Sequence, residues 1–112
     1  MENEQQTHEG QFFIKLYFDN ISVYDKDRNP IASAEVNVSD LSLPIEEQIR
    51  RIVEVFKLPK INELGQPIEY LLAQPDKEVL EFQDDDRRTR CFLDYNIKSG
   101  DKLHLLVDPK GA

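Results

Sequence analysis

The chain has 112 residues, of which 39% are hydrophobic and 32% charged, a composition typical of one soluble domain and too apolar for a disordered chain. Its 22 acidic and 14 basic residues give a net charge of −8. This charge disfavours binding to nucleic acid and to anionic membranes, and it favours basic protein partners. We recognise no signal peptide and no apolar run long enough to span a bilayer, so we expect a cytoplasmic protein without membrane contact.

The first half of the domain predicts a β-hairpin. Residues 1–10 are polar, and we expect a disordered lead there. Apolar residues alternate over 11–18 and again over 31–38, which is the pattern of strands with one buried face. The turn-forming sequence Asp-Lys-Asp-Arg-Asn-Pro lies between them at 25–30. Residues 21–24 either extend the first strand or form a lobe.

An α-helix is predicted from residue 45 onward. Pro44 and the acidic residues after it suit a helix start. Apolar residues follow at i, i+4, i+7, i+8 and i+11, and they form one stripe: Ile45, Ile49, Ile52, Val53 and Phe56. The opposite, polar face is assigned to Gln48, Arg50, Arg51 and Glu54. Pro59 is expected to end the helix.

Three further strands are predicted, over 68–73, 79–82 and 103–107, with a turn at 74–77 and a charged loop at 83–90. The order β-β-α-β-β-β predicts an α+β fold, in which a mixed sheet of four to five strands packs on one helix. We see no internal repeat and no second domain. The domain is expected over 11–108, followed by a flexible tail over 109–112.

A family resemblance appears in the last quarter of the chain. Asp94-Tyr95-Asn96-Ile97, followed by Leu103-His104-Leu105, resembles the C-terminal segment of ubiquitin, which carries the same motifs at the same separation. Residues 12–15, 34–36 and 58–59 resemble other parts of that family more weakly. The resemblance covers 11–112 and implies the ubiquitin-like β-grasp fold. The long 19–30 connection and the longer charged loop around residue 84 depart from the family pattern.

A second resemblance concerns residues 97–103, Ile-Lys-Ser-Gly-Asp-Lys-Leu. This segment is similar to the YukD-like ubiquitin relatives found with bacterial type VII secretion, in which a Gly-Asp turn precedes the last strand. Those proteins generally lack a conjugation tail. This resemblance therefore implies a bacterial ubiquitin-like protein that is not attached to others.

Two candidate sites follow from the resemblance to ubiquitin. Leu71, His104 and Leu106 fall on the positions of its apolar recognition patch, and strand parity places them opposite in phase to the expected core. Phe13 and Tyr17, on the outer face of the first strand, either extend this patch or are covered by the long hairpin lobe. The alternative is that these are the scattered exposed apolar residues normal for any surface.

The second candidate site is the C-terminal tail, Lys110-Gly111-Ala112, which stands where ubiquitin ends in Arg-Gly-Gly. Conjugation needs slim residues there, because the terminal carboxylate must enter a narrow channel for activation. The alternative is an exposed, frayed end.

No residue pattern indicates catalysis, a cofactor or a metal. Asp25-x-Asp27-x-Asn29 resembles the start of an EF-hand loop, but Pro30 and Val36 occupy the positions that need Gly and Glu. The carboxylates at 84–86 are interpreted as a solvated loop. Arg88 and Arg90 lie near Cys91, but the run Cys91-Phe92-Leu93 is typical of a chain entering the core, so Cys91 is interpreted as structural.

We therefore expect a ubiquitin-like protein modifier or adaptor, not an enzyme, which is a monomer and acts by binding other proteins. If it is conjugated, its partners are activating and conjugating enzymes and a deconjugating protease. One alternative is a non-conjugated component of a larger assembly, as in the YukD-like relatives. The other is a sulfur carrier, a β-grasp protein that ends in Gly-Gly, in contrast to the Ala112 terminus here.

Overall fold

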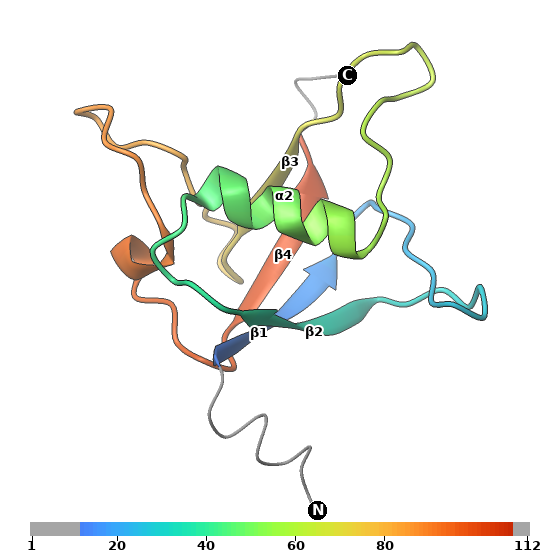
Figure 1. The fold of residues 1–112 in the computed structure, drawn as a ribbon, viewed down its shortest axis with the longest axis horizontal. Helices are drawn as coiled ribbons and strands as arrows, with labels where there is room; N and C mark the ends of the chain where they lie inside the picture. Colours follow the sequence, from blue (N-terminus) through green and yellow to red (C-terminus); the bar gives the residue numbers. More distant parts are fainter. Residues whose placement is uncertain (1–11, 109–112) are drawn as a thin grey trace, which may run out of the picture.

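The computed structural model describes residues 12–108, so the predicted N-terminal lead and the tail Lys110-Gly111-Ala112 lie outside the described residues. Its elements, in chain order, are β1 (Phe12–Phe18), β2 (Ser33–Val38), α2 (Ile45–Val55), β3 (Tyr70–Ala73), the 3₁₀ helix η1 (Phe92–Tyr95) and β4 (Lys102–Val107). Figure 1 shows α2 lying across one face of the sheet.

The four strands form one mixed sheet in the order β2-β1-β4-β3. The central strands β1 and β4 are parallel, with Leu16 opposite Leu103, whereas both outer pairs are antiparallel. The predicted α+β class, with a helix on one face of a mixed sheet, is confirmed. The arrangement is compatible with a β-grasp fold.

The strand predicted at 79–82 is wrong. In the described part of the chain this segment pairs with β3 only through an isolated bridge, Val79 to Ala73, and one hydrogen bond from the Leu80 N–H to the Leu72 C=O at 2.8 Å. The side chain of Leu80 is fully buried and belongs to the core. The next hairpin begins at the Gln83–Thr89 bridge, so too few residues remain between Leu80 and Gln83 to extend the pairing with β3.

Helix α2 differs from its prediction at two points. It ends at Val55, before Pro59, because the chain reverses at Lys57, where φ is +54°. Gln48, which we expected on the polar face, is buried. Its side-chain amide donates a 2.8 Å hydrogen bond to the Asp40 carbonyl, so the connection between β2 and α2 covers this position and satisfies it.

The core lies between α2 and the sheet. The apolar stripe of α2 supplies Ile45, Ile49, Ile52 and Val53, each at most 7% exposed. The largest fully buried side chains come from all parts of the described chain: Phe92, Ile14, Leu16, Ile45, Leu72, Leu80, Leu103 and Leu105. The apolar stripe of α2 and the inward faces of the strands thus form one core.

Four hairpin loops share one backbone design that the sequence did not reveal. They span residues 25–29, 62–66, 74–78 and 84–88. In each loop the first residue accepts a bond from the N–H of the fourth and donates to the C=O of the fifth. The fourth residue adopts a positive φ, as in a type I turn followed by a G1 bulge. These residues are Arg28, Gly65, Lys77 and Arg87.

Aspartate carboxylates stabilise two of these loops by accepting backbone hydrogen bonds. The Asp25 carboxylate accepts hydrogen bonds from the N–H groups of Asp27 and Asn29, at 2.8 and 2.9 Å. Asp84 does the same for residues 86 and 88, and the bond from the Arg88 N–H is the main reason why its pKa is lowered. The interpretations of 25–29 as a turn and of 84–86 as a loop are therefore confirmed, and residues 21–31 form a lobe.

We predict that Leu105→Ala lowers the free energy of unfolding by about 2–5 kcal/mol, because it opens a cavity in the central strand pair. Leu105 is fully buried, whereas Leu64 is 80% exposed. Leu64→Ala is therefore the matched control and should change stability by less than about 0.5 kcal/mol. Urea unfolding measures both, and equal losses would contradict this core.

A second prediction concerns the loop at 62–66. Gly65 has φ +80°, and a Cβ placed there would meet no atom within 4 Å. Gly65→Ala should cost about 1–2 kcal/mol from backbone strain alone. Gly65→Asn should cost less, since asparagine tolerates this conformation. Thermal unfolding of the two variants tests the loop design, which would be refuted if alanine were the better tolerated.

Candidate functional site

The face of the sheet opposite α2 carries the predicted recognition residues. Leu106 on β4 lies directly opposite Leu71 on β3. His104, two residues before Leu106, lies opposite Ala73 on one side and Tyr17 of β1 on the other. The structure thus brings together the three residues predicted for the patch and one of its two candidate extensions, Tyr17. We call Tyr17, Leu71, His104 and Leu106 the outer-face cluster; all four are partly exposed.

His104 is held in place within this cluster. Its ring stacks on that of Tyr17, with centroids 5.4 Å apart and planes at 26°. Its Nδ1 lies 3.1 Å from a carboxylate oxygen of Asp19, an ion pair when the imidazole is protonated. The next residue, Asn20, accepts a 3.3 Å bond from the Val107 N–H. The chain leaving β1 therefore anchors this end of β4 and orients the histidine.

Phe13 does not join the outer-face cluster. Lys15 and Lys102, which lie opposite each other in the β1–β4 register, separate it from His104. At that far end the Phe13 N–H donates to the Ser99 hydroxyl at 3.1 Å, and the Gly100 N–H donates to the Phe13 carbonyl at 2.7 Å. The predicted extension of the patch through Phe13 is interrupted by two lysines.

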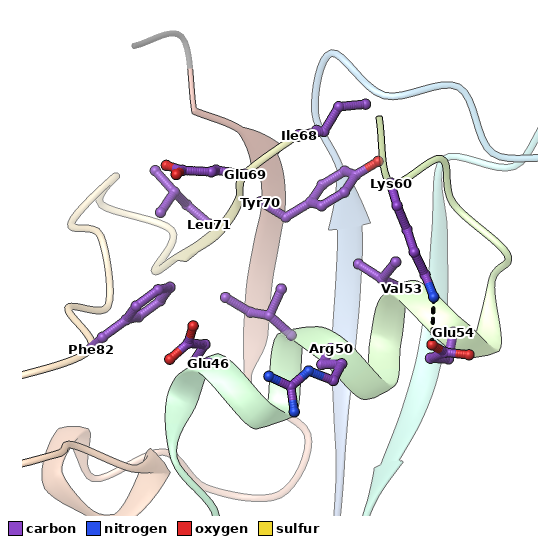
Figure 2. Close-up of a pocket in the computed structure, with 11 residues that line it drawn as sticks. Glu46, Arg50, Val53, Glu54, Lys60, Ile68, Glu69, Tyr70, Leu71 and Phe82 are labelled. Carbon is purple, nitrogen blue, oxygen red and sulfur yellow. Dashed lines mark hydrogen bonds and ion pairs between the residues drawn. The ribbon is translucent and has the colours of Figure 1, made fainter. Parts of the chain in front are cut away.

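A groove between α2 and β3 is a feature that the sequence analysis missed. It has a volume of about 390 Å³. Figure 2 shows residues 68–71 on one side of it and α2 on the other, with Phe82 at one end. Ile68 and Phe82 were predicted to lie in the strands 68–73 and 79–82, but both lie outside the regular strands and are partly buried against the core.

Polar contacts close one end of the groove. Lys60 Nζ lies 2.8 Å from a Glu54 carboxylate oxygen, a bond that lowers the pKa of Glu54. The Tyr70 hydroxyl donates a 2.6 Å hydrogen bond to the Pro59 carbonyl. Burial raises the pKa of the Tyr70 phenol, because the phenolate would lose its hydration.

The segment carrying the ubiquitin-like motif forms a structural corner. Asp94 accepts a 2.8 Å hydrogen bond from the Cys91 N–H, and Asn96 adopts a left-handed conformation. The Tyr95 hydroxyl accepts bonds from the Glu81 N–H at 2.8 Å and from Arg90 at 3.1 Å. These contacts hold residues 91–97 in place, so the segment stabilises the fold. Over residues 12–108, no group of three or more metal-ligating side chains occurs.

Comparison with known proteins adds no family to this geometry. A scan against protein-family models finds no match for the chain, and a search of curated proteins finds no similar sequence. None of the helices in the described ranges is long and apolar enough to cross a membrane.

We predict that the phenol of Tyr70 titrates above its usual pKa of 10 and that stability falls at high pH. The raised folded-state pKa means that its contribution is complete below about pH 10 and is lost as the pH rises through the folded pKa. Phenolate absorbance measures the titration. Tyr70→Phe should remove the part of the phenolate absorbance change that occurs at the highest pH. It should also reduce the loss of folding stability at high pH. An unchanged titration curve would contradict the buried phenol.

Proposed function

We propose that this chain is a ubiquitin-like protein modifier or adaptor, which acts by binding other proteins through the outer-face cluster. The observation that carries the proposal is the direct pairing of Leu71 with Leu106 next to His104, on the sheet face that α2 leaves uncovered. An apolar pair beside a fixed, amphipathic aromatic group is the composition of an interaction hot spot.

The surroundings of the cluster favour a particular kind of partner. Asp19 borders His104, and the chain as a whole carries a net charge of −8. A partner with an apolar centre and a basic group facing Asp19 would complement this side of the cluster and the overall field, while Lys15 and Lys102 beyond His104 suit an acidic group on the other side. Because the cluster lies on regular strands, little backbone ordering is needed on binding, which reduces the entropic cost.

Conjugation through Ala112 extends the same proposal. The activating enzyme would use ATP: the Ala112 carboxylate would attack its α-phosphorus, forming an acyl-AMP and releasing pyrophosphate. An enzyme cysteine would displace AMP to form a thioester, and a lysine amine of the target would displace that cysteine to form an amide. A deconjugating protease would hydrolyse the amide. The support is the Lys110-Gly111-Ala112 sequence, together with its resemblance to the ubiquitin terminus.

A non-conjugated role in a larger assembly, of the YukD-like kind, is the alternative. The Asp108 N–H donates a 2.8 Å hydrogen bond to the Glu69 carbonyl, so sheet pairing continues to the residue just before Pro109. The support for this alternative is the resemblance of residues 97–103 to the YukD-like proteins, which generally lack a conjugation tail. The sulfur-carrier alternative rests on the fold resemblance alone.

We predict that Leu106→Asp abolishes capture of a specific partner from lysate of the source cells, since it places a charge at the centre of the cluster. Lys102→Asp is the matched control, because Lys102 lies on the same strand and face but beyond the cluster. Thermal unfolding should show both variants folded. Equal partner recovery with both, quantified by mass spectrometry, would contradict the proposed surface.

The conjugation step has a separate test. The tagged chain, with or without Gly111 and Ala112, is incubated in the same lysate with ATP. Conjugation predicts higher-mass adducts on a denaturing gel that require the last two residues. Absence of adducts, with identical partner capture by both forms, would favour the adaptor and exclude conjugation in that lysate.

A further inference from the structure

The outer edge of β3 presents backbone groups to the groove beside α2. The Asp108 N–H bonds to the Glu69 carbonyl, which fixes the phase of the β3–β4 ladder. Residues 69, 71 and 73 therefore direct their backbone groups toward β4, and Tyr70 and Leu72 direct theirs away from it. The Leu72 carbonyl is used by the Leu80 N–H at 2.8 Å. Within residues 12–108, the Tyr70 N–H and C=O have no backbone partner.

The groove next to this edge has an apolar floor. Ile49 and Val53 of α2 supply one side, and they are 6% and 7% exposed. Leu71 and Phe82 are half-buried and line the other side. Figure 2 shows the open space between Phe82 and the Lys60 segment, with Tyr70 between them. A strand laid along β3 could insert its inward side chains here.

The groove is lined by both acidic and basic side chains, but the two basic ones are already paired. Arg50 forms an ion pair with Glu47 and Lys60 forms one with Glu54. Glu46 of α2 and Glu69 just before β3 also line the groove, and neither forms an ion pair with a basic side chain of the described residues. A continuing hollow shares Glu46, Leu71 and Phe82 and adds Glu81. The opposite end is occupied by the Lys60–Glu54 ion pair. The charge at the free end therefore suits a basic side chain.

We propose that this groove binds an extended segment of a partner protein as an added strand beside β3. The Tyr70 N–H and C=O would form the main-chain hydrogen bonds, apolar side chains of the segment would fill the floor, and a Lys or Arg would contact Glu46 and Glu69. A second copy of this chain is the wrong occupant, because pairing of two β3 edges would bring the same carboxylates together. The proposal is independent of the outer-face cluster, with which the groove shares only Leu71.

The probe is a capped eight-residue peptide of alternating Val and Lys. We expect it to bind, and we expect the amide exchange of Tyr70 to slow at least tenfold at saturation, because its N–H becomes part of a ladder. A peptide of alternating Ser and Lys, with the same charge, should bind at least tenfold more weakly, since it cannot fill the apolar floor. Methylating the peptide nitrogens that face β3 should also abolish binding.

The protein controls separate the groove from general attraction to an acidic protein. Glu46→Lys with Glu69→Lys should weaken peptide binding about tenfold, through two lost ion pairs. Glu63→Lys with Glu78→Lys changes the net charge equally, on exposed hairpin loops, and should weaken it less than threefold. Leu106→Asp should leave peptide binding unchanged. The proposal is overturned if both charge pairs weaken binding equally, if Tyr70 exchange is unaffected, or if no binding occurs at millimolar peptide.

Discussion

The parallel pairing of β1 with β4 is the interaction on which the rest of this fold depends. It joins residues near the two ends of the described chain, Lys15 with Lys102 and Leu16 with Leu103. Parallel strands need a long crossover, and here that crossover contains all the other elements. β2 and β3 each attach to one member of the pair, and α2 covers the inner face that this pair fills with Leu16, Leu103 and Leu105.

Both proposed surfaces depend on the central β1–β4 pair. The outer-face cluster exists because β4 has β1 on one side and β3 on the other, which aligns His104 with Tyr17 and Leu106 with Leu71. The groove exists because β3 is the edge strand and its hairpin partner departs after Leu80. Leu71 is the residue common to the two surfaces, so only variants at other positions, such as Leu106 or Glu46, can distinguish them.

Periodic patterns predicted the regular elements, because one-sided burial imposes period two on strands and a helical stripe on α2. They placed Leu71, His104 and Leu106 on one face. They failed at 79–82, where the apolar residues contribute to the core but pair with β3 through a single bridge, and at Gln48, where a hydrogen bond to the Asp40 carbonyl compensates burial. The shared backbone design of the four hairpin loops was also missed, since the left-handed position is filled by Arg28, Gly65, Lys77 or Arg87 and leaves no sequence repeat. The groove needs strands and helix together, so no local pattern could show it.

The central claim is that the outer face of the sheet contacts another protein. Site-specific photo-cross-linking tests it most directly, with a photoreactive phenylalanine analogue placed at Leu106 in the source cells. A second probe at Asp85, on the exposed tip of the 84–88 loop, provides the comparison. The account predicts one discrete cross-linked protein from position 106 that is absent from position 85. Identical products from both positions, or none from position 106, would contradict it.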